Sequence, residues 1–220
     1  MITAPPAGAV LSVYERALAD AVAGRRPVLT LVDDLGRKSA VHPAAWCRRR
    51  LPGDGRLLHQ CSGPTLDVGC GPGRLTAALL RQGVPALGID VSAAAVGLAR
   101  QRGATVLRRD VFAALPGHGR WRHLLLADGN IGIGGDPVTL LRRCRDLLAR
   151  GGRVHAEVAP PGTRSWAGPA MLRHGDAAAA PLRWAAVAAD DMAAVAGEAA
   201  LRVLATWTEA GRWFATLTAR

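Results

Sequence analysis

The sequence predicts an α/β fold built on a parallel sheet, with a helix and a hairpin at its N-terminal end. From residue 64 onward, short apolar runs of strand character alternate with amphipathic helical runs. This alternation forces neighbouring strands to pair in parallel through right-handed crossovers. A glycine-rich turn follows the first run, and an acidic residue follows each of the next three. Ligands bind outside the carboxyl ends of such strands, so the pattern also predicts a ligand site there.

The N-terminal part shows different signals. Apolar residues at helical spacing predict a helix over residues 9–23 that ends at Gly24. The runs at 28–32 and 39–42 flank a glycine-containing turn and predict a β-hairpin, whose second strand ends at Pro43. Residues 52–55 are expected to form a loop. We therefore expect a helix and hairpin segment at 1–62, followed by an α/β domain at 63–220.

The elements of the α/β part follow in order. Ser92 is a predicted N-cap, Pro137 fits the first turn of a helix, and Asp190 is expected to cap a helix that runs to about residue 200. Other helices are expected at 73–82, 92–102 and 137–150, the last ending at Gly151 and Gly152. Strands are expected at 65–68, 86–91, 104–111, 123–127 and 153–158, two short ones within 163–188, and an antiparallel pair at 201–208 and 212–218.

Composition limits the functional classes. No stretch approaches the ~20 apolar residues of a membrane span, and residues 1–8 lack the features of a signal peptide, so we expect a soluble cytoplasmic protein. Cys47, Cys61, Cys70 and Cys144 show neither a C-x-x-C pair nor zinc-ligand spacing. They are interpreted as reduced thiols, and no metal is expected.

The formal net charge is +11, which by itself favours an anionic partner such as a nucleic acid. Lys38 is the only lysine, and the arginines are scattered except at 48–50 and 142–145. Neither cluster has the interleaved aromatic residues that stack on single-stranded RNA. A nucleic-acid partner is therefore possible but less expected than a small-molecule substrate.

The glycine turn carries the most specific signal. Residues 66–73 read LDVGCGPG, and glycines at 69, 71 and 73 let the backbone bend tightly and approach a ligand. The dinucleotide fingerprint G-x-G-x-x-G differs, because here the third glycine comes one residue early and Asp67 precedes the first glycine by two. Asp90, Asp110 and Asp128 follow the next three strands and fall at the same sheet edge.

This arrangement resembles motif I and the later acidic positions of the class I S-adenosylmethionine (AdoMet) methyltransferases, over roughly residues 60–160. The resemblance implies a Rossmann-like, doubly wound sheet of seven strands in the order 3-2-1-4-5-7-6, with the last strand antiparallel. It also implies that residues 1–62 cap the site. The N/D-P-P-aromatic box that is typical of enzymes that methylate the exocyclic amines of bases does not follow the fourth strand. The Pro-Cys nucleophile expected for cytosine C5 methylation is also missing, because Cys144 lies mid-helix.

The same resemblance assigns roles at the cofactor. Asp67 would reach the ammonium of the methionine part, Asp90 the ribose hydroxyls and Asp110 the adenine amino group, and the sulfonium would point towards residues 128–130. The full set of implied cofactor contacts is Asp67, Gly69, Cys70, Gly71, Gly73, Arg74, Leu75, Asp90, Val91, Asp110, Val111, Asp128, Gly129 and Asn130.

Three residues are candidate general bases: Asp128, His155 and Glu157. His155 and Glu157 are two apart on one strand and so share a face, although a structural role for His155 is the simpler interpretation. Trp46, Trp166 and Trp184 are candidates for lining an acceptor pocket, with core packing as the alternative.

The expected function is O- or N-methylation of a small molecule. An RNA methyltransferase and a non-catalytic AdoMet-binding regulator remain alternatives, and the oligomeric state is open.

Overall fold

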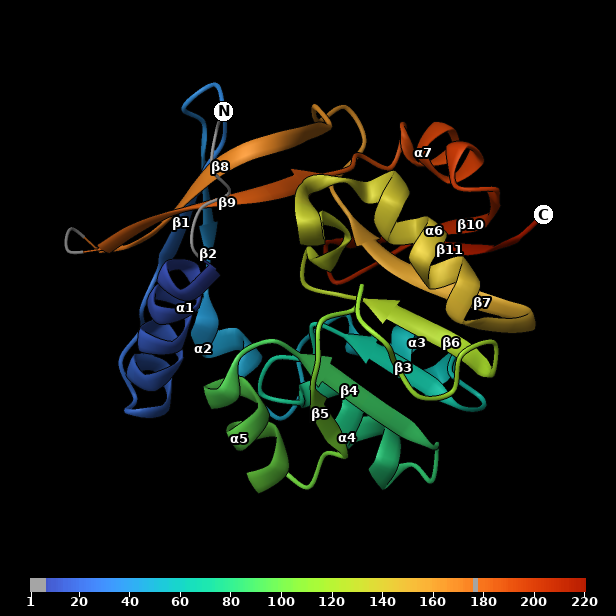
Figure 1. The fold of residues 1–220 in the computed structure, drawn as a ribbon, viewed down its shortest axis with the longest axis horizontal. Coiled ribbons are helices and arrows are strands. Elements are labelled where there is room, and N and C mark those ends of the chain that lie inside the picture. The colour runs from blue at the N-terminus through green and yellow to red at the C-terminus, as the bar shows by residue number, and fades with distance from the viewer. Residues whose placement is uncertain (1–6, 176–177) are drawn as a thin grey trace.

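A seven-stranded sheet forms the centre of the fold in the computed structural model, which describes residues 7–175 and 178–220 (Figure 1). The strand order is β10-β11-β7-β6-β3-β4-β5, and β11 pairs antiparallel with β7. When the seven strands are numbered from 1 to 7 along the chain, their order from β5 to β10 is 3-2-1-4-5-7-6, which confirms the predicted order. The strands are β3 (Thr65–Val68), β4 (Ala86–Asp90), β5 (Val106–Arg108), β6 (Trp121–Leu126), β7 (Leu148–Val158), β10 (Leu201–Glu209) and β11 (Arg212–Ala219).

Helices connect the parallel strands. They are α4 (Arg74–Arg81), α5 (Ala93–Gln101), α6 (Pro137–Leu147) and α7 (Met192–Glu198), with the 3₁₀ segment η1 (Asn130–Gly135) after β6. The Ser92 hydroxyl accepts from the backbone N–H of Ala95, which confirms the predicted N-cap of α5. Asp136 accepts from the N–H of Thr139 and begins α6 in the same way. The Ser92 cap places the end of β4 directly before the N-terminus of α5, whereas η1 separates the end of β6 from α6.

Apolar side chains cover both faces of this sheet. On β6, Leu124 and Leu126 join one buried cluster with residues of α6 and α7, whereas Leu125 joins another with residues of α4 and α3 (Asp54–His59). Successive strand residues point to opposite faces, so both faces of β6 are buried. The run HLLLA at 123–127 is continuous rather than alternating for this reason.

A second, antiparallel sheet lies to one side of the first (Figure 1). Its order is β2-β1-β8-β9, with β1 (Leu29–Val32), β2 (Lys38–Val41), β8 (Trp166–His174) and β9 (Ala178–Ala186). Helix α1 (Ala7–Val22) packs on β8 and β9. The predicted helix and hairpin are confirmed, and β8 and β9 are longer than the two short strands expected. The division at residue 62 stays a prediction, and the sheet draws on both sides of it.

Other expectations were wrong in detail. α6 ends at Leu147, and Gly151 and Gly152 lie inside β7 rather than after a helix. Trp121 pairs with Leu148 and His123 with Arg153, so β7 carries extra residues opposite β6. Gly151 has φ +72° there. A bulge that needs glycine therefore gave the same signal as a helix end.

Two further differences concern short segments. Residues 52–55 do not form a loop throughout, because α3 begins at Asp54, and α2 (Pro43–Trp46) precedes it. Asp190 does not cap α7, since its carboxylate accepts from the N–H of Gly162. Asp191 takes the N-cap position without a side-chain hydrogen bond to the helix. Within the described ranges, no helix is long and apolar enough to cross a membrane.

Gly73, the third glycine of the turn, allows the cost of overpacking to be separated from the cost of the backbone conformation. Gly73 and Gly83 both have φ +77°, but a Cβ at Gly73 would lie 2.8 Å from Cβ of Ala99, whereas one at Gly83 would meet nothing within 4 Å. Gly83→Ala should lose roughly 1–2 kcal/mol of unfolding free energy from backbone strain alone. Gly73→Ala should lose about 1–3 kcal/mol more through overpacking. Urea unfolding followed by circular dichroism measures both, and equal losses would contradict the packing role.

Candidate cofactor site and its buried ion pairs

A cavity of about 360 Å³ lies between the carboxyl edge of the seven-stranded sheet and the second sheet with α1. Its lining includes every residue of the implied cofactor set except Gly73, which instead packs against α5. The lining residues of that set are Asp67, Gly69, Cys70, Gly71, Arg74, Leu75, Asp90, Val91, Asp110, Val111, Asp128, Gly129 and Asn130. Four strand ends and one glycine turn thus meet in a single cavity.

The glycine turn is held in place by polar contacts. Gly69 has φ +68°, and a Cβ there would lie 2.7 Å from Nδ2 of Asn130. That amide donates to the carbonyls of Val68 and Gly69, both at 2.9 Å. Asn130 therefore fixes the end of β3 in the structure. The N–H of Gly71 donates to Oδ2 of Asp90 at 2.9 Å, which ties the turn to β4.

Two of the predicted acids are buried in the cavity wall. Asp67 accepts from the hydroxyl of Thr76 at 2.7 Å, and burial raises the pKa of its carboxyl to about 6 against that stabilising contact. Asp90 also accepts from the N–H of Ser92 at 2.8 Å, and burial raises its pKa. Each oxygen of Asp90 accepts one backbone hydrogen and retains a second lone pair for a ligand.

The other predicted positions differ in exposure. Asp110 is exposed at the rim and accepts from the N–H of Phe112 at 2.9 Å. Cys70 lines the cavity as a buried thiol whose pKa burial raises well above its usual value, so it is a neutral wall residue. Trp46 and Trp184 also line the cavity, whereas Trp166 does not.

A network of buried charges lies beneath the site. Arg74 pairs with Asp54 and, through Nη2, with Oδ2 of Asp128 at 2.5 Å. Arg212 pairs with Asp54 at 2.9 Å, with Oδ1 of Asp128 at 3.0 Å and with Oε2 of Glu157 at 2.6 Å. Two guanidinium groups and three carboxylates therefore hold α3, α4, β7, β11 and the end of β6 together.

Asp128 sits in a strained position within this network. Its φ is +55°, which is uncommon for a residue other than glycine, and its N–H donates to Oε2 of Glu157 at 2.5 Å. Both of its oxygens are engaged by arginines, so it is not a free base. Glu157 is engaged by Arg212 and lies outside the cavity lining.

Asp54 and Arg212 were missed in the sequence. Asp54 is 1% exposed, yet it occurs in the glycine-rich stretch PGDG, which is typical of a solvated turn. Arg212 begins the last strand after a turn. Their pairing joins residues 158 positions apart, and no local sequence pattern predicts it.

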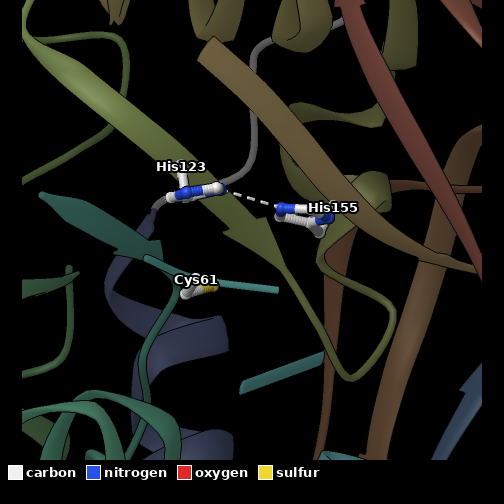
Figure 2. Close-up of side chains that lie close together, drawn as sticks. All are labelled: Cys61, His123 and His155. Carbon is white, nitrogen blue, oxygen red and sulfur yellow. Dashed lines mark hydrogen bonds between the residues drawn. The ribbon is translucent and has the colours of Figure 1, made fainter. Parts of the chain in front are cut away.

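His155 lies away from the cavity, in a hydrogen-bonded chain (Figure 2). The N–H of Ser62 donates to Nε2 of His123 at 3.2 Å, so the ring hydrogen of His123 is on Nδ1 and points to Nε2 of His155 at 3.0 Å. Nδ1 of His155 then donates to Oγ1 of Thr216 at 3.1 Å, and that hydroxyl donates to Gln60. All four imidazole nitrogens have partners, and both tautomers are defined.

Cys61 lies beside the two imidazoles, and one potential ligand atom from each residue falls within 4.8 Å of the others. The ring centroids are 5.3 Å apart with 20° between the ring planes, and the two imidazoles are joined directly by a nitrogen-to-nitrogen hydrogen bond (Figure 2). Both acceptor lone pairs already receive N–H hydrogens, and Cys61 donates to the carbonyl of Leu57. This geometry fits a packed, neutral cluster rather than a metal site.

Replacing Asp54 tests the ion-pair network. Asp54→Asn keeps the shape but leaves Arg74 and Arg212 short of a buried anion, so the free energy of unfolding should fall by about 3–5 kcal/mol. Asp146→Asn removes a partner of the exposed Arg145 and should change it by less than about 0.5 kcal/mol. Denaturant unfolding measures both, and a small loss in Asp54→Asn would show that the network contributes little.

The histidine chain predicts acid sensitivity. Burial lowers the pKa of His123 from 6.5 to about 4 and that of His155 to about 3. The unfolded chain therefore binds protons first as the pH falls, and the stability present above pH 6.5 is lost between 6.5 and about 4. One histidine should contribute about 2 kcal/mol of loss at pH 5.

Thermal unfolding at pH 7.5 and 5 measures this loss. The double variant His123→Leu/His155→Leu should lose less stability between these pH values than the wild type, whereas replacing the exposed His59 with Gln should leave the difference unchanged. Asp67 titrates with the opposite sign in all three proteins, so only the difference between proteins reports the histidines. An unchanged pH dependence in the double variant would contradict the assignment.

Comparisons with known proteins place this fold. A family model described as "Methyltransferase domain" matches residues 65–152, and no curated protein matches the sequence. The crystal structure of a SAM-dependent methyltransferase from Bacteroides fragilis, in complex with S-adenosyl-L-homocysteine, superposes with a TM-score of 0.78 at 19% identity, covering 96% of each chain.

Other solved structures cover about three quarters of the chain. The CcbJ methyltransferase from Streptomyces caelestis gives a TM-score of 0.58 at 14% identity, covering 76% of this chain and 90% of that one. The O-methyltransferase NcsB1 of neocarzinostatin biosynthesis gives 0.56 at 20% identity, covering 76% and 54%. Residues 65–152 thus match the methyltransferase domain model, and the chain as a whole has the fold of the SAM-dependent methyltransferases.

Proposed function

We propose that the protein transfers the methyl group of AdoMet to a small-molecule acceptor. One observation carries the proposal: a single cavity gathers the glycine turn and the acids at or just after the ends of β3, β4, β5 and β6. Residues from four separate parts of the chain therefore share one cavity wall. The structure from B. fragilis, which covers nearly the whole chain, was solved with S-adenosyl-L-homocysteine.

The charges of the wall suit the methionine part of AdoMet. Arg74 lines the cavity, and its Nε is a buried donor without a partner among the described residues. A buried unpaired donor costs free energy, which a bound carboxylate would recover. Asp67 lies in the same wall and would face the ammonium group. The site thus offers complementary groups for both ends of an amino acid.

The nucleoside part has its own candidate partners. Asp90 is fixed by two backbone N–H groups and would accept from both ribose hydroxyls through its remaining lone pairs. Asp110 at the rim would accept from the adenine amino group, with Val91 and Val111 beside the ring. When bound, AdoMet supplies an electrophilic methyl group. The chain's own residues would hold it in line with the acceptor.

The acceptor would be activated mainly by placement. The cavity holds no histidine among the described residues, and both oxygens of Asp128 are engaged by Arg74 and Arg212. Asp67, Asp90 and Asp110 also line the cavity, but they are assigned to the cofactor, so no base among these residues is left for the acceptor. Alignment is then the main source of acceleration, and effective molarities supply roughly 7–11 kcal/mol in favourable cases. We therefore assign Asp128, and Glu157 behind it, to shaping the site rather than to removing a proton, and His155 to packing.

The cavity is covered by other parts of the protein, which favours a small acceptor. α1, β1, β8 and β9 all contribute lining residues, so the space beside the cofactor wall is roofed by protein. NcsB1, which shares the fold, was solved with 1,4-dihydroxy-2-naphthoic acid, and the related glycopeptide N-methyltransferase MtfA with AdoMet. O- and N-transfer both remain consistent with the site.

Titration with S-adenosyl-L-homocysteine tests the cofactor site. The wild type should bind it with micromolar affinity, and Asp90→Ala should bind at least about 30-fold more weakly, because two charge-assisted hydrogen bonds are lost. Isothermal titration calorimetry measures both constants. Asp34→Ala, on an exposed turn, is the matched control and should bind like the wild type.

Two outcomes would count against the proposal. Absence of binding by the folded wild type would overturn it, and equal binding by wild type and Asp90→Ala would remove the proposed ribose site. Thermal unfolding of each protein shows whether the variant is folded. Methylated product, detected by mass spectrometry with labelled AdoMet, would then separate an enzyme from a protein that only binds the cofactor.

A further inference from the structure

The cavity has two chemically different halves. Its charged lining residues, which are Asp67, Arg74, Asp90, Arg109, Asp110 and Asp128, all belong to the ends of the large sheet and to the helix that follows β3. The part contributed by the four-stranded sheet is formed by Leu29, Leu31, Val41, Leu172, Leu182 and Trp184. Within the described residues, that wall contains no charged side chain.

Strand alternation explains how the charges are kept out. Leu172 on β8 lines the cavity, whereas its neighbours Met171 and Arg173 are exposed. On β9, Leu182 and Trp184 line the cavity, and Arg183 between them is exposed. The chain has 28 lysines and arginines in total, yet these strands direct theirs to the outer face. The absence of charge is thus a property of one face of this sheet.

Aromatic side chains complete the apolar half. Trp46 and Tyr14 meet edge to face, with ring centroids 5.8 Å apart at 64°, and both line the cavity. Trp184 contributes a third ring from β9. Aromatic walls of this kind favour flat ligands, because stacked and edge-to-face contacts add to the burial of apolar surface. They also offer little to a flexible polar chain.

Resting on the proposed function, we infer that the acceptor is an uncharged, flat and largely apolar molecule, which binds with its body against this wall. A nucleotide or other phosphorylated acceptor would leave charge unpaired there, and burying an unpaired charge is costly. In the transfer, a lone pair of the acceptor forms the bond to the methyl carbon. The bond from carbon to sulfur breaks and leaves its electrons on sulfur, and any proton remaining on the acceptor goes to water.

Binding to the protein saturated with S-adenosyl-L-homocysteine tests this inference. The probes are 2-naphthol and naphthalene-2,6-disulfonate, which share a ring system, but the second carries charge at both ends, so that one charge must meet the wall. Calorimetry should show at least about tenfold tighter binding of 2-naphthol, equivalent to 1.4 kcal/mol. Equal or tighter binding of the disulfonate, or no binding of 2-naphthol, would overturn the inference.

Two variants locate the effect on the wall. Leu172→Glu places a carboxylate in the cavity and should weaken 2-naphthol binding at least about tenfold. Arg173→Glu makes the neighbouring change on the outer face and should stay within about twofold of the wild type. Leu172→Met keeps the volume and apolarity and should also bind, which guards against a general loss of structure. Equal affinities in Leu172→Glu and wild type would overturn the inference.

The titration also separates this inference from the proposed function. If S-adenosyl-L-homocysteine binds but the disulfonate is preferred, only the class of acceptor is wrong. If S-adenosyl-L-homocysteine itself does not bind to the folded protein, the proposed function fails, and the inference that rests on it fails as well.

Discussion

The pairing of Arg74 and Arg212 with Asp54 and Asp128 is the interaction on which the site depends. Arg74 begins the helix after the glycine turn, and Arg212 begins the last strand. The two guanidiniums therefore bind the same carboxylates although they are far apart in the sequence. A buried charge is tolerated only when it is paired. The fold therefore has to bring α3 and the terminal hairpin to the carboxyl edge of the sheet, which closes the floor of the cavity.

The ion-paired floor and the apolar roof, which the four-stranded sheet forms, offer different chemistry to a ligand. Charges at the strand ends are held by backbone N–H groups and arginines, as in the contacts of Asp90 with Gly71 and Ser92. The roof offers hydrocarbon and rings from a different sheet. Under the proposed function, a charged cofactor would bind beside an apolar acceptor, because the floor offers charged partners and the roof offers apolar ones.

The sequence predicted the alternating strands and helices and nearly all of the cavity's polar wall, because those signals are local, whereas the order of the seven strands followed from the resemblance to the class I methyltransferases. A glycine at 69 and an aspartate at 90 each mark the end of a strand, and strand ends of a parallel sheet must share an edge. Asp54 and Arg212 escaped because their roles arise only from a contact across 158 positions. The length of β8 and β9 escaped for a similar reason, since β8 pairs with β1 of the hairpin near the N-terminus and β9 pairs with β8. His155 is a candidate base in the sequence because it shares a strand face with Glu157, whereas its hydrogen-bond partner His123 is 32 positions away and gives no local signal.

The second sheet is built from two distant segments of the chain, β1–β2 and β8–β9, and this separation affects the order of folding. Leu29 pairs with His174, so the two partners are 174 − 29 = 145 positions apart in the chain. Contacts of such separation form late, after the loop between them has been shortened by other structure. During synthesis the β1–β2 hairpin leaves the ribosome well before β8, so its apolar face stays uncovered until β8 has been made. The floor depends on a contact of similar range, because Arg212 joins Asp54 across 158 positions, so neither wall of the cavity is complete before the C-terminal part of the chain is in place.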